Sequence, residues 1–234
     1  MPFFCLGRNM KIQQGRVSIK EGIVIGEGGG RSLKADIFLP PLEEKSRPAV
    51  LFIHGGGWIE GDRSQLRGYG ILLARLGFVC MCNSYRLSNE SIWPAQIQDV
   101  NCAIRYLRAN ATDLGLDPNR IGVSGNSAGG HLSLMAAATN YDQIFEGEGG
   151  SNEVSSEIKA VCAIYPPTTI RQLEMLNPLE NAFLMLMGKE AKKEDFDKAS
   201  PLNYVTEDYP PCMLIHGSTD SVVRLKDSTK FYEK

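Results

Sequence analysis

The sequence predicts an α/β fold with a mostly parallel central sheet flanked by helices. Short apolar segments at residues 49–53, 78–83, 120–124 and 160–165 alternate with stretches of helical periodicity. Two glycine-rich motifs directly follow two of these predicted strands. With 234 residues, 43% of them hydrophobic, the chain can bury one substantial core. We therefore expect a single domain over residues 1–234.

Two antiparallel strands are expected to open the sheet. Residues 16–25 and 33–39 alternate between apolar and polar side chains, and the glycine cluster at residues 26–30 separates them. This cluster lacks the Gly-Lys-Ser/Thr ending of a phosphate-binding loop and does not open a helix. It therefore predicts a hairpin turn.

The following segments alternate as helix and strand. Residues 64–76 and 94–110 are predicted helices, and in the second one four apolar residues share one face, namely Ile97, Val100, Ile104 and Leu107. The triplet at residues 117–119 predicts a turn before the strand at 120–124. Residues 130–138 read as a helix, residues 212–216 as the last strand, and a further helix begins near Leu225.

The motif Gly-Asn-Ser-Ala-Gly at residues 125–129 lies between a predicted strand and a predicted helix. A serine at such a turn is forced toward positive φ, and flanking glycines remove the Cβ atoms that would collide there. The turn lifts the hydroxyl clear of the fold, so Ser127 is the predicted nucleophile. A helix-capping serine is the structural alternative.

A second motif, His-Gly-Gly-Gly-Trp at residues 54–58, follows the strand at 49–53. The bare backbone N–H groups of Gly55, Gly56 and Gly57 can approach a ligand oxygen, which is what an oxyanion hole requires. We expect the N–H of Ala128 to join them. His54 precedes these glycines and is interpreted as a residue that orients the loop.

Both motifs, their order, and the segments Tyr-Arg-Leu at 85–87 and Trp-Pro-Ala-Gln at 93–96 resemble the α/β-hydrolase superfamily. Within it the chain is most similar to the esterase and lipase branch with an HGGGW loop, especially small carbohydrate acetyl and feruloyl esterases. The resemblance implies a small cap at about residues 167–200. It also implies that Asp220, in a His-Gly-x-x-Asp pattern, is the acid of a catalytic triad, with a turn aspartate as the alternative.

Three more residues are candidates for the substrate pocket. Trp58 and Tyr85 are predicted to wall it, although packing beside a strand end explains large aromatic side chains equally well. Asn126 is expected to brace the turn next to Ser127. The Met-rich stretch at residues 184–188 fits either a pliable substrate wall or ordinary core packing.

The histidine base of a triad is not evident. This fold orders its triad as serine, acid, histidine, and no histidine follows Asp220. His54, His131 and His216 each have a structural explanation, in the loop, in a helix and at a strand end. The resemblance implies a further strand and helix beyond Lys234, with the histidine between them, so we expect a C-terminally truncated and nearly inactive chain.

The predicted function is hydrolysis of short carboxylic esters through an acyl-serine intermediate, on substrates such as acetyl or feruloyl esters of carbohydrates. Two alternatives stay open: an amide hydrolase resembling arylformamidases, and a non-catalytic ligand-binding homologue. Neither an organic cofactor nor a metal is expected.

Bulk properties exclude other classes of function. The net charge is −2 and basic residues are scattered, which argues against nucleic-acid binding. No apolar run is long enough to span a membrane, and the start lacks a secretory signal, so the predicted location is cytoplasmic, with secretion still open. Six cysteines are expected as buried thiols. A homodimer is compatible with the sequence.

Overall fold

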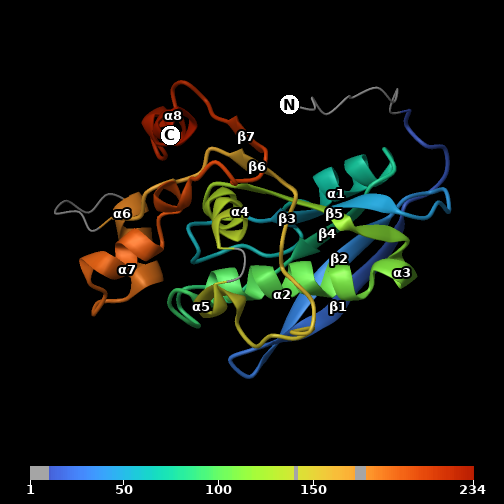
Figure 1. Cartoon of the computed structure of the whole chain (residues 1–234), viewed down its shortest axis with the longest axis horizontal. Helices are drawn as coiled ribbons and strands as arrows, with labels where there is room; N and C mark the ends of the chain where they lie inside the picture. The colour runs from blue at the N-terminus through green and yellow to red at the C-terminus, as the bar shows by residue number, and fades with distance from the viewer. Residues whose placement is uncertain (1–10, 140–141, 172–177) are drawn as a thin grey trace.

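The computed structural model describes residues 11–139, 142–171 and 178–234. These residues form one seven-stranded sheet in the order β1-β2-β4-β3-β5-β6-β7 (Figure 1). The strands are β1 (Ser18–Gly28), β2 (Arg31–Leu39), β3 (Arg47–Ile53), β4 (Val79–Asn83), β5 (Leu116–Asn126), β6 (Ala160–Ile164) and β7 (Cys212–Ile215).

The sheet is antiparallel at one side and parallel elsewhere. β2 pairs antiparallel with both β1 and β4, whereas β3, β4, β5, β6 and β7 pair with one another in parallel. Ile53 at the end of β3 stands opposite Gly125 near the end of β5. Because parallel strands end at the same edge of a sheet, this register brings the two glycine motifs together.

Helices cover both faces of the sheet. They are α1 (Arg67–Ala74), α2 (Ala95–Ala109), α3 (Ala111–Leu114), α4 (Ala128–Ala138), α5 (Gln143–Glu146), α6 (Pro178–Met187), α7 (Lys193–Lys198) and α8 (Leu225–Glu233), with a 3₁₀ turn η1 (Pro201–Tyr204). Figure 1 shows α1 on one side of the central strands and α2 on the other. The mostly parallel sheet with flanking helices confirms the predicted fold class.

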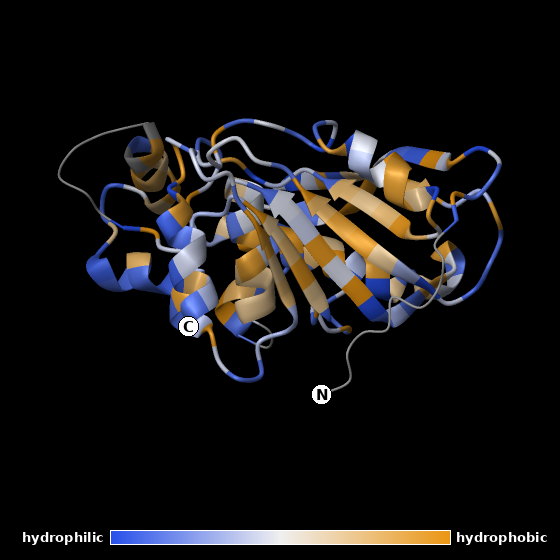
Figure 2. Ribbon diagram, turned by 90° about the horizontal axis from the view of Figure 1, so that it is seen from above, coloured by the Kyte–Doolittle hydropathy of each residue, from blue (hydrophilic) through white to orange (hydrophobic). Residues whose placement is uncertain are grey.

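Side-chain alternation along the strands produces the two cores. Phe52, Cys80 and Cys82 pack with Ala74 of α1 in a small cluster, whereas their neighbours Ile53 and Met81 join the larger cluster that includes α2 and α4. The four apolar residues predicted to share one face of α2 are all fully buried in that cluster. Apolar residues accordingly concentrate in the central strands (Figure 2).

Three expectations about element boundaries and exposure were wrong. β1 continues to Gly28, so the hairpin turn is confined to Gly29 and Gly30. Residues 117–119 lie within β5, although the N–H of Asn119 bonds Oδ1 of Asp117 at 2.9 Å, as it would in a turn. Cys212 is exposed, whereas Cys80, Cys82 and Cys102 are buried and Cys162 is half-buried. Cys5 lies outside the described residues.

The region expected as a cap contains α6 and α7. They follow β6 in the chain and precede η1 and β7, so the segment is an insertion between two neighbouring strands. Residues 172–177 of the predicted cap lie outside the described residues. Leu186 and Met187 of the Met-rich stretch are buried, whereas Met185 is 39% exposed.

Candidate active site

Ser127 occupies a strained turn between β5 and α4. Its φ is 53° and its ψ is −120°, a backbone conformation that costs a residue with a side chain about 1–3 kcal/mol. Two backbone bonds hold it there: its N–H donates to the carbonyl of Ile164 at 2.9 Å, and its carbonyl accepts from His131 at 2.9 Å. The conformation is the one predicted for a nucleophilic serine at such a turn.

The glycines of this motif allow close approach to β3. A Cβ at Gly129 would lie 1.9 Å from the carbonyl oxygen of Ile53, and one at Gly125 would lie 2.6 Å from the same atom. Real Cβ atoms do not approach oxygen so closely, so both positions require glycine.

The glycine loop, residues 54–58, lies directly against Ser127. A Cβ at Gly55 would be 3.3 Å from Cβ of Ser127, and Gly56 and Gly57 have positive φ values of 108° and 59°. Their three N–H groups donate no hydrogen bond to any described residue. Ala128 is the first residue of α4, where N–H groups lack a helical acceptor. These are the donors predicted for the oxyanion hole.

His54 is buried within the loop. Its Nδ1 lies 2.8 Å from the carbonyl oxygen of Gly55, and its ring stacks on Tyr85 with centroids 4.2 Å apart. Burial lowers its pKa, although the bond to Gly55 opposes this effect. A neutral ring packed inside the loop fits the predicted orienting role.

Trp58 and Tyr85 are enclosed by protein atoms. Trp58 is 0% exposed and packs against His131 and Phe183, with ring centroids 5.1 Å and 5.8 Å away. Tyr85 is 1% exposed and donates its hydroxyl to the carbonyl of His54 at 3.0 Å. These contacts account for both side chains by packing, and a role in substrate binding stays a prediction.

Asn126 contacts a residue that the sequence analysis missed. Its Nδ2 lies 3.0 Å from the hydroxyl of Tyr165, which directly follows β6 and has a φ of 39°. The position of Tyr165 at the end of a predicted parallel strand, before two prolines, was the available signal. The side chain of Tyr165 thus places its phenol beside the turn that carries Ser127.

Asp220 lies in the turn after β7. Its Oδ1 accepts from the N–H groups of Val222 at 2.9 Å and Val223 at 3.0 Å, as in the turn-aspartate alternative. Its Oδ2 is 3.6 Å from Nε2 of His216. Within the described chain this carboxylate therefore serves its own turn, and its triad role stays a prediction.

Within the described residues, none of the three histidine rings hydrogen-bonds the side chain of Ser127. His216 bonds Ser228 and the carbonyl of Val223, both at 2.8 Å. His131 is fully buried and bonds the carbonyl of Ala199 at 2.7 Å, and burial lowers its pKa to about 4. With His54 facing Gly55, the described chain presents no proton acceptor to the serine.

Helix α6, in the region expected as a cap, contacts the glycine loop. A Cβ at Gly57 would lie 3.4 Å from Cβ of Ala182. Beyond it, a cavity of about 590 Å³ is lined mostly by apolar side chains, including those of Trp93, Phe145 and Met187. Ser127 is not among its lining residues, so this cavity is separate from the predicted nucleophile.

Comparison with known proteins decides the family. The sequence model of the BD-FAE family matches residues 35–234, most of the chain. The chain belongs to the BD-FAE family. This assignment, together with the fold, confirms membership of the esterase branch of the α/β-hydrolases.

Esterases are among the relatives of this BD-FAE chain. Esterase LipC of Mycobacterium tuberculosis is 35% identical over 201 residues, covering 82% of this chain and 49% of LipC. The chain thus spans about half the length of the curated relatives it matches. A truncated form of a carbohydrate esterase from gut microbiota superposes with a TM-score of 0.80 at 29% identity, covering 92% of this chain and 82% of that one.

A third comparison is Thermogutta terrifontis esterase 2 phosphonylated by sarin. It has a TM-score of 0.78 and 27% identity, and covers 95% of this chain and 79% of that one. Among the described residues of the BD-FAE chain, no group of three or more His, Cys, Asp and Glu side chains could hold a metal ion. No helix in that part of the chain is long and apolar enough to cross a membrane.

Proposed function

We propose that the protein is a carboxylic ester hydrolase that acts through an acyl intermediate on Ser127. The observation that carries the proposal is the contact between Gly55 of the glycine loop and the strained turn at Ser127. The N–H groups of Gly55, Gly56, Gly57 and Ala128 are the proposed donors to the substrate oxygen. The esterase relatives support the same reaction class.

The proposed reaction has two steps. Oγ of Ser127 gives its proton to a base and bonds the ester carbonyl carbon, and the carbonyl oxygen becomes an oxyanion held by the backbone N–H groups. The C–O bond to the alcohol then breaks as the alcohol takes up the proton that Ser127 gave to the base. Water then attacks the acyl-serine and releases the acid. Each oxyanion donor contributes about 3 kcal/mol to the stabilisation of the transition state.

The described residues supply no group that could accept the proton of the Ser127 hydroxyl. Losing the histidine of a triad costs about 10⁶ in turnover, while the oxyanion hole and binding leave about 10³ over water. We therefore expect the 234-residue chain to hydrolyse esters slowly. Asp220 is proposed as the acid of the triad.

Acyl esters of carbohydrates are the proposed substrates. The superposition with a carbohydrate esterase from gut microbiota, which covers 92% of the chain, supports this proposal. Acetyl and feruloyl esters are the two groups to compare first.

Hydrolysis of p-nitrophenyl acetate tests the reaction class. We would measure it for the 234-residue chain, for the protein as its gene encodes it, and for Ser127→Ala in each. The proposal expects turnover in the gene-encoded protein and its loss in Ser127→Ala. Turnover that survives Ser127→Ala would overturn it.

The alternative is a non-catalytic binding protein on the same fold. Its support is that, within the described residues, no histidine ring hydrogen-bonds the Ser127 side chain. Labelling of the gene-encoded protein with a fluorophosphonate separates the two, because a reactive serine forms a covalent adduct at residue 127 and an inert one does not.

A further inference from the structure

One neighbouring segment holds the glycine loop at both ends. The hydroxyl of Tyr85 donates to the carbonyl of His54 at 3.0 Å, and the N–H of Ser88 donates to the carbonyl of Trp58 at 2.7 Å. The Ser88 hydroxyl reaches the same Trp58 oxygen at 3.1 Å. Glycines with positive φ restrain the chain weakly, so these end contacts hold the loop together with its own bonds, in which the N–H groups of Ile59 and Glu60 donate to the carbonyl of Gly56.

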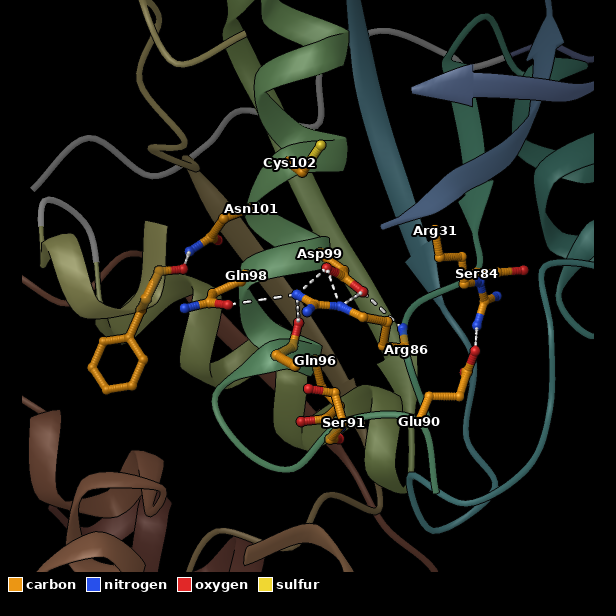
Figure 3. A network of polar contacts seen from close by, with 12 residues as sticks. Arg31, Ser84, Arg86, Glu90, Ser91, Gln96, Gln98, Asp99, Asn101 and Cys102 are labelled. Carbon is orange, nitrogen blue, oxygen red and sulfur yellow. Dashed lines mark hydrogen bonds and ion pairs between the residues drawn. The ribbon is translucent and has the colours of Figure 1, made fainter. Parts of the chain in front are cut away.

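Arg86, inside that segment, is anchored to α2 by Asp99 (Figure 3). The carboxylate of Asp99 accepts from the backbone N–H of Arg86 at 2.8 Å, from its Nε at 3.0 Å and from its Nη2 at 2.7 Å. A single carboxylate thus fixes both the backbone and the side chain of the residue between Tyr85 and Ser88.

This ion pair is shielded from water. The side chain of Asp99 is 2% exposed and that of Arg86 is 13% exposed. Gly28 of β1 passes directly over the pair, and a Cβ there would lie 2.8 Å from Oδ1 of Asp99. Charge-assisted bonds in such dry surroundings are short and directional, which suits them to fix a loop.

A second anchor holds the outer part of the segment. Oε2 of Glu90 accepts from the N–H of Leu87 at 2.8 Å, and its other oxygen pairs with Arg31 (Figure 3). This pair is more exposed than the first, with side-chain exposures of 40% for Arg31 and 34% for Glu90. Solvent weakens an exposed pair, so the Arg86–Asp99 pair is the stronger anchor.

We propose that Arg86 and Asp99 are positioning residues for the glycine loop and act on it through Tyr85 and Ser88. Their effect on hydrolysis rests on the proposed function, whereas their effect on loop order does not. Residue 99 lies on a different element from both catalytic motifs, which is why neither motif pointed to it.

Asp99→Asn tests this inference, with Glu146→Gln as its matched control. Arg105 of α2 pairs with Glu146 at 2.6 Å, with exposures of 2% and 17%. Both substitutions turn the carboxylate of a largely buried ion pair into an amide, and both pairs include one residue of α2: Asp99 lies on α2, whereas Glu146 lies on α5 and pairs with Arg105 of α2. Neither Arg105 nor Glu146 bonds the glycine loop in the described structure.

Two measurements are made on the protein as its gene encodes it. Hydrogen exchange of the N–H groups of Ile59 and Glu60, which donate to the carbonyl of Gly56 in the loop at 3.0 Å and 3.1 Å, is expected to accelerate about tenfold in Asp99→Asn and to stay near wild type in Glu146→Gln. For p-nitrophenyl acetate, kcat is expected to fall about 100-fold in Asp99→Asn while KM changes little, because misplaced oxyanion donors act on the transition state.

The outcomes separate the two proposals. Equal rates of hydrogen exchange at the loop in Asp99→Asn and Glu146→Gln would overturn the positioning role of Arg86 and Asp99. Faster exchange in Asp99→Asn alone, in a protein without ester turnover, supports positioning and contradicts the proposed function. If Asp99→Asn does not fold, Tyr85→Phe removes one loop bond without touching the ion pair, and unchanged exchange in that variant would overturn the inference.

Discussion

At the scale of single residues, the site depends on backbone positions that few side chains can occupy. Ser127 has a positive φ because its N–H and carbonyl are both engaged, by Ile164 and His131. Gly129 lies so close to Ile53 that it has no room for a Cβ. Strain at the serine is therefore maintained by bonds to two other elements.

Gly129→Ala is expected to destabilise the protein by about 3 kcal/mol, because its Cβ would overlap the carbonyl oxygen of Ile53. Urea unfolding measures the change. The control is Gly68→Ala in α1, where a Cβ meets nothing within 4 Å and alanine favours the helix by up to about 1 kcal/mol. Similar unfolding midpoints for the two variants would contradict this account.

The sequence allowed part of the site to be predicted. Ser127 and the three glycines belong to motifs in which local sterics dictate the residue types. Tyr165 was missed because its contact with Asn126 depends on the parallel register of β5 with β6, in which Asn126 stands opposite Ile164. Such a contact between segments 39 residues apart has no local signature.

At the scale of elements, the two edges of the sheet differ. β7 pairs only with β6 among the described strands, and Met213 and Ile215 on it are 61% and 48% exposed. On the opposite edge, the N–H of Glu27 in β1 bonds the carbonyl of Gly149, so a loop covers part of that strand. Uncovered edge strands with apolar side chains favour pairing between molecules.

Met213→Lys is expected to reduce self-association of the 234-residue chain, because a charge on an edge strand opposes strand pairing. Sedimentation velocity at several concentrations measures the effect. Val24→Lys places the same charge at a 55% exposed position on β1 and is expected to change little. A chain that stays monomeric at all concentrations would show that the β7 edge does not self-associate.

Element types followed from periodicity, but some boundaries did not. The apolar face of α2 was evident from the spacing of Ile97, Val100, Ile104 and Leu107. The triplet at residues 117–119 looked like a turn because Asp117 bonds the N–H of Asn119, yet pairing with β3 extends β5 back to Leu116. Tertiary pairing overrides the local preference there.

At the scale of the whole molecule, stability is tied to uncharged buried histidines. Burial lowers the pKa of both His54 and His131, the latter to about 4. An unfolded histidine binds a proton near pH 6.5. Below that pH the unfolded state therefore binds protons that the folded state does not bind. As a result, the free energy of unfolding decreases as the pH falls.

Between pH 6.5 and pH 4, His131 alone is expected to remove about 3 kcal/mol from the free energy of unfolding. Urea titrations across this range would measure the slope. His131→Gln keeps a donor near the carbonyl of Ala199 but cannot titrate, so its stability should depend less steeply on pH. An unchanged slope in His131→Gln would assign the acid sensitivity to other groups.

The carbonyl of Ile53 limits both glycines of the serine turn, and Gly55 in turn lies against Ser127 and Asn126. Residues 54–58 and 125–129, about 70 residues apart in the chain, are therefore packed so closely that each limits the residues possible in the other. A chimera that takes residues 54–58 from a distant homologue must take residues 125–129 as well. In evolution and in engineering alike, substitutions in one segment have to be accompanied by substitutions in the other.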